Sequence, residues 1–287
     1  VITKALSGFY YVRCGAETVT CRARGRFRNT NESPLVGDSV SFERDGDSDG
    51  TVTQLHPRRN EFIRPPVANI DTMVIVASAV IPVTEPLLID RMAAIAVLKG
   101  AEPVICLNKC DMNTADVLFD TYSRAGFRVF RVSAETGDGT AELLAALADR
   151  TSAFTGNSGV GKSSILNALG LDLAVGEVSD KLGRGRHTTR HVELHSLPGG
   201  ALIVDTPGFS SFDIGMMENI GREELERAFF DFAPFLGKCR FRDCAHVKEP
   251  DCAVLGALAD GKIVPSRHES YTKLLEASHE IKAREYK

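Results

Sequence analysis

Between residues 67 and 214, the hydrophobic positions of the chain follow two alternating patterns. Short apolar, mostly β-branched runs are typical of buried strands, and they occupy residues 72–77, 103–107, 129–132, 151–155 and 201–204. Apolar residues at helical spacing occupy residues 86–99, 115–125, 141–147 and 164–169. Strands that alternate with helices predict an α/β domain with a mostly parallel sheet.

The first 66 residues carry a different pattern, in which short β-type runs are separated by turn residues. These runs occupy residues 8–12, 18–22, 39–42 and 50–55. About five strands in about 60 residues predict a small β-barrel of the OB type. The segment Arg64-Pro65-Pro66 is expected to be a linker, because proline interrupts both helices and strands.

Beyond residue 214, helical patterns at residues 222–230 and 266–287 flank a stretch that is rich in cysteine. The chain is therefore expected to form three domains, over residues 1–66, 67–214 and 215–287.

Composition narrows the class of protein. The 287 residues are 43% hydrophobic and 25% charged, as in ordinary globular proteins, and the formal net charge of −4 gives no sign of a nucleic-acid binder. No apolar run is as long as a membrane span, and the N-terminus lacks a signal-peptide pattern. Seven cysteines without such a signal indicate a reducing compartment. We expect a cytoplasmic monomer that does not contact membranes.

A phosphate-binding motif follows the predicted strand at 151–155. It has the form G-x-x-x-x-G-K-[ST] and comprises Gly156, Asn157, Ser158, Gly159, Val160, Gly161, Lys162 and Ser163, with Ser164 beginning the next helical run. Its backbone N–H groups can surround phosphate oxygens, Lys162 can reach the β- and γ-phosphates, and the Ser163 hydroxyl can ligate Mg²⁺. The alternative is a glycine-rich turn without a ligand.

Two further motifs point to guanine. Asn108-Lys109-Cys110-Asp111 matches N-K-x-D at the end of the predicted strand 103–107. A carboxylate at Asp111 accepts the N1–H and amino hydrogens of guanine, which adenine does not offer together, while Asn108 can bond the ring edge and Lys109 can cover the base. Ser133-Ala134 follows the next strand and matches a short loop whose backbone contacts the base. By itself, an N-K-x-D sequence is as often a surface turn as a binding site. Its position at the end of a strand in a P-loop protein indicates a guanine-binding site.

The segment after the P-loop helix is polar and glycine-rich, and it contains His187, Thr188 and Thr189. One of the threonines can close over the γ-phosphate and Mg²⁺ as a switch, although a plain basic surface loop is the alternative. Asp205-Thr206-Pro207-Gly208 then forms a D-x-x-G element, in which Asp205 would hold Mg²⁺ through water and Gly208 would contact the γ-phosphate.

The residue after D-x-x-G is Phe209, and a phenyl ring cannot orient water by hydrogen bonding. Hydrolysis is then slow without a partner, or another residue supplies the polar group. His187 is the nearest candidate in sequence, and a solvent-facing histidine is the alternative. The candidate catalytic residues are therefore Lys162, His187, Thr188 and Thr189, and the candidate Mg²⁺ ligands are Ser163, Thr188, Thr189 and Asp205.

The order of these motifs is unusual. In a Ras-like domain N-K-x-D and S-A follow the P-loop, whereas here both precede it. The sequence therefore predicts a circularly permuted GTPase domain, whose D-x-x-G segment leads directly into the C-terminal region.

Two clusters lie outside this domain. Cys239, Cys244, His246 and Cys252 offer three thiols and an imidazole, which predicts one structural zinc ion per chain rather than buried cysteines with a surface histidine. In the N-terminal region, Arg22, Arg24, Arg26 and Arg28 alternate with other residues, so one strand would carry them on a single face. Phe27 and nearby tyrosines offer stacking surfaces, so this face is either an RNA-binding surface or a solvated charged face.

Taken together, these motifs resemble the RsgA (YjeQ/EngC) family of bacterial small-ribosomal-subunit GTPases. The resemblance rests on Arg22-x-Arg24-Gly25, Val36-Gly37-Asp38, the permuted motif order, Gly185 to Thr189, Asp205 to Phe209 and the cysteine–histidine knuckle. It implies a cytoplasmic protein that binds the 30S subunit and its 16S rRNA late in maturation, and that hydrolyses GTP to GDP slowly unless the subunit stimulates it. It also implies that the chain belongs to a class of GTPases with a hydrophobic residue in place of the water-orienting glutamine of Ras-type enzymes, which Phe209 matches. A rival hypothesis is an RNA-binding switch that nucleotide toggles, with incidental turnover.

Overall fold

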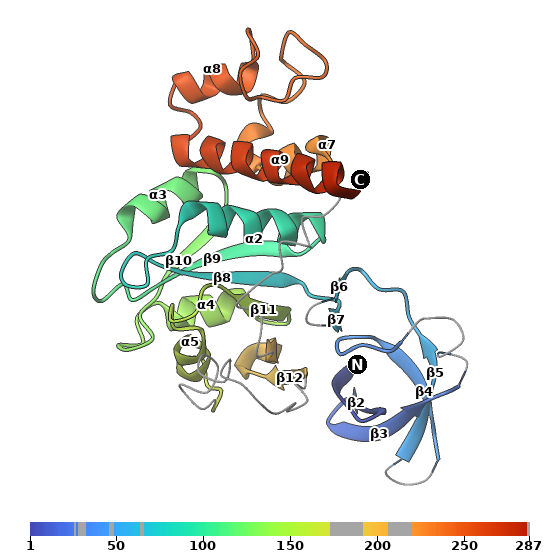
Figure 1. The fold of residues 1–287 in the computed structure, drawn as a ribbon. Helices are drawn as coiled ribbons and strands as arrows, with labels where there is room; N and C mark the ends of the chain where they lie inside the picture. Colours follow the sequence, from blue (N-terminus) through green and yellow to red (C-terminus); the bar gives the residue numbers. More distant parts are fainter. Residues whose placement is uncertain are drawn as a thin grey trace.

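The computed structural model describes residues 1–25, 27, 33–45, 49–63, 66–172, 192–205 and 220–285 of the chain. Side chains are described for all of these residues except Asp205 and residues 279–285. Figure 1 shows a β-barrel at the N-terminal end, a central layered α/β region, and a helical C-terminal region beyond it. No helix in the described ranges is both long and apolar enough to cross a membrane.

The central region is a mostly parallel sheet, as the alternating pattern predicts. Its strands lie in the order β10-β9-β8-β11-β13-β12, and all neighbours pair in parallel except β12 with β13. Their bounds are β8 (Thr72–Ser78), β9 (Glu102–Asn108), β10 (Arg128–Arg131), β11 (Thr151–Thr155), β12 (Glu193–Ser196) and β13 (Leu202–Asp205). Since parallel strands all end at one edge, the loops after β9, β11 and β13 meet at that edge.

Helices cover both faces of this sheet. Successive residues of β8 point to opposite faces, so Met73, Ile75 and Ala77 enter one core cluster and Val74 and Val76 enter another. The first face is covered by α2 (Pro86–Leu98) and α3 (Asp116–Arg124), and the second by α4 (Thr140–Ala146) and α5 (Lys162–Ala168). Burial on both faces explains why these strands read as continuous apolar runs.

The N-terminal strands form the predicted OB-type barrel, in the order β1-β2-β3-β5-β4 with β3 and β5 parallel. They are β1 (Ile2–Leu6), β2 (Phe9–Cys14), β3 (Glu17–Ala23), β4 (Val40–Arg44) and β5 (Asp49–Leu55). The sequence pattern missed β1, in which only Ile2 is buried. Beside the expected linker, β6 (Glu61–Ile63) pairs antiparallel with β7 (Pro66–Ala68), so Pro66 belongs to a strand, while residues 64 and 65 lie outside the described residues. Pro66 is the first residue of β7, one of the positions at which strands tolerate proline.

The barrel and the central sheet share a seam. Strand β1 pairs with β12, so the two sheets join into one of eleven strands. Lys4 Nζ lies 2.7 Å from Glu193 Oε2, and Arg13 Nη1 donates to Ser196 Oγ at 2.7 Å. No sequence pattern indicated β12, whose four residues carry a mixture of polar and apolar side chains.

The C-terminal region packs on the outer side of α2. Its elements are α7 (Arg222–Ala228), the 3₁₀ turn η3 (Phe230–Phe232), α8 (Ala253–Ala259) and α9 (Pro265–Glu285). Another 3₁₀ turn, η1 (Pro198–Gly200), belongs to the central region, where it lies between β12 and β13. Figure 1 shows α9 lying along α2. Arg267 of α9 is 1% exposed and pairs with Asp90 of α2 at 2.5 Å and with Asp231 of η3 at 2.8 Å. The rings of Phe127 and Phe229 face its guanidinium at 5.1 and 4.4 Å. A buried cation held by carboxylates from two regions fixes how those regions meet.

Candidate functional site

The P-loop lies between β11 and α5 at the carboxyl edge of the parallel sheet. Gly161 precedes the helix with a φ of +95°, and a Cβ there would clash with Asn108 Nδ2. Gly156 has a φ of +139°, and a Cβ there would clash with the carbonyl of Val76. Both positions therefore require glycine, and the loop can hold its backbone close to β8 and to the loop after β9.

Lys162 begins α5 and turns back over the loop. Its Nζ donates to the carbonyl oxygens of Gly156 and Asn157, each at 2.7 Å. Burial lowers the pKa of this ammonium to about 8. Ser163 and Ser164 are half-buried in the first turn of the same helix, beside the loop that carries Asn157 and Ser158. A bound phosphate would place negative charge beside the buried ammonium of Lys162 and so stabilise its protonated form.

This lowered pKa predicts a pH dependence of nucleotide binding. Phosphate favours the charged ammonium, so nucleotide raises the pKa of Lys162 and binding takes up a proton. Affinity for GTP is therefore full below about pH 8 and falls as pH rises through that value, by about tenfold between pH 7 and 9. Equilibrium titration with a fluorescent GTP analogue measures this.

The control is Lys162→Arg, whose guanidinium keeps its charge over this range. Any pH dependence that remains in that variant belongs to the guanine base or the phosphates. A wild-type affinity that falls no more than that of the variant contradicts the prediction.

Asn108 links the N-K-x-D loop to the P-loop and to the Ser133-Ala134 segment. It is the last residue of β9 and is 3% exposed. Its Nδ2 donates to the Val160 carbonyl of the P-loop at 2.8 Å, and its Oδ1 accepts from the backbone N–H of Ala134 at 3.2 Å. The N-K-x-D, S-A and P-loop segments are thus brought together by one amide, as their positions at strand ends led us to expect.

Asp111 and Lys109 are held at the same edge. Ser133 Oγ donates to Asp111 Oδ1 at 2.7 Å, which leaves the second carboxylate oxygen of this exposed side chain for a ligand. Lys109 has a φ of +64°, and its Nζ donates to the Ile81 carbonyl in the loop between β8 and α2 at 2.7 Å. That loop also touches the P-loop, since Pro82 lies beside Gly159. Sequence analysis gave no role to Ile81 or Pro82, because neither belongs to a motif.

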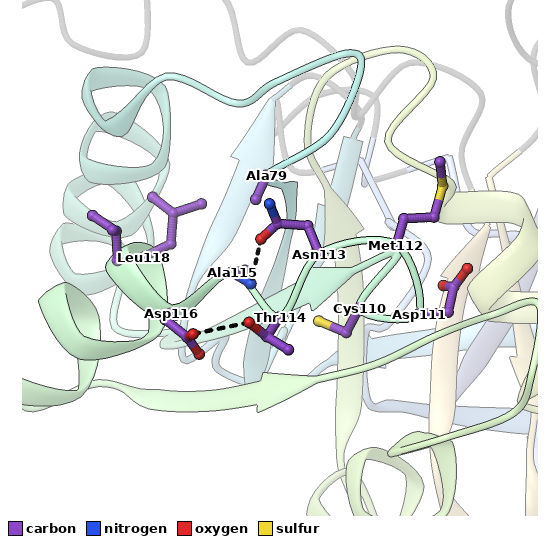
Figure 2. A pocket seen from close by; sticks show the side chains of 10 residues that line it. Ala79, Cys110, Asp111, Met112, Asn113, Thr114, Ala115, Asp116 and Leu118 are labelled. Atoms are coloured by element: carbon purple, nitrogen blue, oxygen red, sulfur yellow. Dashed lines mark hydrogen bonds between the residues drawn. The ribbon is translucent and has the colours of Figure 1, made fainter.

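A hollow of about 620 Å³ opens beside the N-K-x-D loop, lined by Ala79 and the residues from Cys110 to Leu118. Figure 2 shows its polar groups engaged within the loop, where Asn113 Oδ1 accepts from the Ala115 N–H and Thr114 Oγ1 donates to Asp116. No P-loop residue lines it. This hollow therefore lies on the α3 side of the loop and does not include the phosphate-binding backbone.

The D-x-x-G element begins where β13 ends. Strand β13 pairs in parallel with β11, and Leu202 lies opposite Thr151, so Asp205 emerges at the same edge as the P-loop. Its backbone is described and its side chain is not. The predicted residues His187, Thr188, Thr189, Gly208 and Phe209 lie outside the described residues, and their roles stay predictions.

The four predicted zinc ligands converge in the C-terminal region. Donor atoms of Cys239, Cys244, His246 and Cys252 all lie within 4.8 Å of one another. Cys239 Sγ is 3.8 Å from Cys252 Sγ, and His246 Nδ1 is 3.5 and 3.4 Å from these two sulfurs. Tetrahedral zinc with Zn–S of about 2.3 Å and Zn–N of about 2.0–2.1 Å gives edges of about 3.8 and 3.5 Å. The donor set and its spacing therefore fit zinc.

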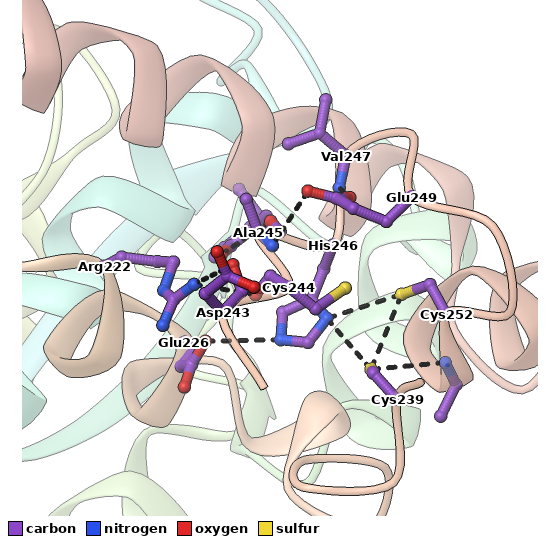
Figure 3. Close-up of polar contacts among 12 residues, drawn as sticks. Arg222, Glu226, Cys239, Asp243, Cys244, Ala245, His246, Val247, Glu249 and Cys252 are labelled. Carbon is purple, nitrogen blue, oxygen red and sulfur yellow. Dashed lines mark hydrogen bonds and ion pairs between the residues drawn. The ribbon is translucent and has the colours of Figure 1, made fainter. Parts of the chain in front are cut away.

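Two carboxylates that sequence spacing did not reveal shape this knuckle (Figure 3). Glu226 of α7 lies 3.2 Å from His246 Nε2, so the imidazole presents its Nδ1 to the sulfurs. Glu249 accepts the backbone N–H groups of Ala245, Val247 and Lys248 at 2.9–3.0 Å. These bonds hold the pKa of Glu249 down, at about 2, and keep the turn between the ligands closed.

Two arginines of the predicted face, Arg22 and Arg24, lie in the described part of the chain. Strand β3 ends at Ala23, so of the four arginines only Arg22 lies in it, and its guanidinium stacks on Phe9 at 4.7 Å. Arg24 follows the strand and pairs with Glu43 at 2.6 Å. Phe27 is 6% exposed and packs in the barrel core, so it offers no stacking surface, contrary to expectation. Arg26 and Arg28 lie outside the described residues.

The fold and the site together define a circularly permuted P-loop GTPase. The P-loop lies at the edge of a mostly parallel sheet, the N-K-x-D and S-A segments precede it in the chain, and D-x-x-G follows it. Family models agree with this class: one described as RsgA GTPase matches residues 55–215, and one described as RsgA N-terminal domain matches residues 1–52. The chain therefore belongs to the RsgA family of GTPases.

Relatives cover the whole chain. A small ribosomal subunit biogenesis GTPase RsgA from Caldanaerobacter subterraneus subsp. tengcongensis is 42% identical over 100% of this chain and 97% of its own length. The protein of the same name from Enterococcus faecalis is 45% identical over 96% of this chain and 93% of its own length.

Two solved structures are similar along the whole fold. YloQ, a circularly permuted GTPase, superposes with a TM-score of 0.81 at 37% identity, over 99% of this chain and 94% of its own. YjeQ from Thermotoga maritima superposes with a TM-score of 0.83 at 32% identity, over 97% of both chains.

Proposed function

We propose that this chain is a GTPase stimulated by the small (30S) ribosomal subunit, that it acts late in the maturation of that subunit, and that it leaves after hydrolysis. The observation that carries the proposal is the joining of the guanine loop to the P-loop through Asn108, in a chain whose full-length relatives are named small ribosomal subunit biogenesis GTPases. The subunit and its 16S rRNA are then the partners, and GTP and GDP the ligands.

In this proposal the nucleotide spans the carboxyl edge of the sheet. The carboxylate of Asp111 reads guanine, with the stem of Lys109 over the base and the Ser133-Ala134 backbone beside it. The residues from Gly156 to Ser164 surround the phosphates with N–H groups, and Lys162 neutralises the β- and γ-phosphates. Gly208 would contact the γ-phosphate as the D-x-x-G segment closes.

Mg²⁺, held by Ser163, Asp205 and one of Thr188 and Thr189, would neutralise charge on the β- and γ-phosphates. His187 would orient the attacking water, since Phe209 cannot accept or donate a hydrogen bond. One structural Zn²⁺ would be held by Cys239, Cys244, His246 and Cys252, whose four protein donors leave no open position for a reactive water.

The remaining assignments belong to the same proposal. The protein acts as a cytoplasmic monomer, and its units divide at about residues 66 and 214. Arg22, Arg24, Arg26 and Arg28 contact rRNA from the barrel, although the pairing of Arg24 with Glu43 makes that residue the weaker contributor of the two described.

Binding of the subunit tests the proposed cycle. If the subunit favours the GTP-bound form, GTP must tighten subunit binding by the same factor, by linkage. We expect the non-hydrolysable analogue GMPPNP to strengthen co-sedimentation with 30S subunits relative to GDP. Equal binding with both nucleotides would contradict a cycle in which hydrolysis releases the protein.

The rival, a passive RNA-binding switch, differs in the role of His187. In an enzyme, His187→Ala lowers subunit-stimulated turnover by about 10²-fold or more while leaving GTP affinity intact. In a passive switch, turnover is incidental and the substitution leaves the stimulated rate unchanged. Single-turnover kinetics with saturating 30S subunits separates these outcomes.

A further inference from the structure

A short loop between two of the metal-binding residues carries an exposed aromatic ring. Cys239 and Cys244 bracket the sequence Arg240-Phe241-Arg242-Asp243. Phe241 is 42% exposed, and both flanking arginines are exposed as well. Exposure of a phenyl ring between two guanidinium groups has no evident role in the packing of the knuckle.

The conformation of this loop is fixed at both ends. The Arg240 backbone N–H donates to the Asp251 carbonyl at 3.2 Å, and its side chain pairs with the Asp251 carboxylate at 2.9 Å. Arg222 of α7 donates to the carbonyl oxygens of Asp243 and Cys244. With Cys239 and Cys244 at its two ends, the loop holds Phe241 in place before any ligand arrives, which lowers the entropic cost of binding.

The ring lies at the edge of a polar hollow. This hollow of about 320 Å³ has Phe241 and three arginines in its lining, together with Gly237, three of the metal-binding residues and one carboxylate, Glu226, which faces His246. The Arg240 guanidinium lies 5.6 Å from the centre of the Phe241 ring. Among the described residues, Arg242 has no carboxylate partner, so its charge stays available to an anion.

We propose that Phe241 stacks on an unpaired RNA base, with Arg242 on an adjoining phosphate and Arg240 held by Asp251 beside the ring. Aromatic rings flanked by arginines are the elements that proteins use to hold single-stranded nucleic acid. This inference rests on the proposed function, and it adds a second RNA-contacting surface at the opposite end of the molecule from the barrel arginines (Figure 1).

A protein partner fits the surface less well. A protein interface is built from several apolar side chains around its anchor. Among residues 220–278, whose side chains the structure describes, the other exposed large apolar side chain is Phe230, and its ring packs on Phe127 at 5.0 Å, beside a different hollow. Phe241 is therefore a single exposed ring, with an arginine on each side of it in the sequence.

The test compares Phe241→Ala with Phe241→Tyr, in the full chain with its zinc content verified. The probes are a fluorescent 12-nucleotide oligouridylate and purified 30S subunits. We expect Phe241→Ala to weaken binding of both by about tenfold, since one stacked base contributes about that much, and Phe241→Tyr to restore it. Phe230→Ala, which removes a ring of similar exposure elsewhere, is the matched control and should bind as the wild type does.

Two results would overturn the inference. If Phe241→Ala binds both probes as tightly as the wild type does, the ring contacts no RNA. If the variant binds 30S subunits more weakly but oligouridylate equally well, the ring contacts a ribosomal protein instead. If the wild-type protein binds oligouridylate but not 30S subunits, the proposed function fails, while the comparison at Phe241 still decides the inference.

The proposed contact of Arg242 with phosphate is tested by the salt dependence of RNA binding. Arg242→Gln should reduce the slope of log affinity for oligouridylate against log salt by about 0.7, the value for one phosphate contact on a single strand. Lys262→Gln removes another exposed charge, which pairs with Asp260, and it should leave the slope unchanged. Equal slopes for Arg242→Gln and the wild type would contradict the phosphate contact.

Discussion

Asp111→Asn is expected to weaken GTP binding by about 10²- to 10⁴-fold and to create binding of xanthosine triphosphate. The carboxylate accepts two hydrogens from guanine, and each hydrogen bond to a charged acceptor contributes about 1.5–3 kcal/mol. An amide in its place turns one acceptor into a donor, which repels the guanine amino group and suits the carbonyl oxygen that xanthine carries at that position. Titration with fluorescent GTP and XTP analogues measures both effects.

The matched control is Asp116→Asn, five residues further along the chain at the start of α3. Asp116 is exposed and pairs with Arg131 at 2.6 Å, and its carboxylate takes no part in the joined motifs. It should bind GTP as tightly as the wild type and show no preference for XTP. Equal losses in the two variants would mean that the loop is merely sensitive to charge, and guanine recognition by Asp111 would be wrong.

Removing zinc is expected to unfold the C-terminal region. Structural zinc sites contribute on the order of 10 kcal/mol of binding free energy, which is comparable to the whole stability of a typical domain. Cys252 also caps the N-terminus of α8, where its sulfur accepts the Leu255 N–H at 3.5 Å. Cys252→Ser should therefore lower the zinc content from one ion per chain towards zero and remove much of the helical signal of residues 220–285.

The control is Cys14→Ser, which replaces an exposed cysteine in the barrel. It should keep its zinc and its thermal unfolding midpoint. Zinc content by atomic absorption and helicity by circular dichroism report on both variants, and chelation of the wild-type protein should reproduce the Cys252→Ser result. A folded, helical C-terminal region without metal would show that the four side chains form an ordinary packed cluster.

Motif chemistry made the nucleotide site predictable. Glycines at positions 156 and 161, the amide at 108 and the carboxylate at 111 are the residue types that phosphate and guanine require, and strand ends bring them together. The apolar runs predicted the central strands because burial on both faces removes the ambiguity of a half-exposed strand. The convergence of Cys239, Cys244, His246 and Cys252 on one candidate metal site was equally predictable, since few other roles place three thiols and an imidazole within fourteen residues.

Long-range pairing was not predictable from local pattern. Strand β12 carries no apolar pattern of its own, and it forms because β1 and β13 offer free edges on its two sides. Arg267 reads as an ordinary surface residue of a helix, whereas its carboxylate partners Asp90 and Asp231 come from distant parts of the chain. The alternation of arginines suggested one strand for all four, but the period of a strand does not reveal where the strand ends, and β3 ends at Ala23, before Arg24.

The central claim is that the small ribosomal subunit activates GTP hydrolysis by this chain. Its most direct test is steady-state phosphate release from GTP by the purified protein alone, with 30S subunits and with 50S subunits. We expect slow turnover alone, stimulation of about 10²-fold or more by 30S subunits, and little change with 50S subunits. GTP binding with the same turnover under all three conditions would contradict the account and leave a nucleotide-toggled RNA switch in its place.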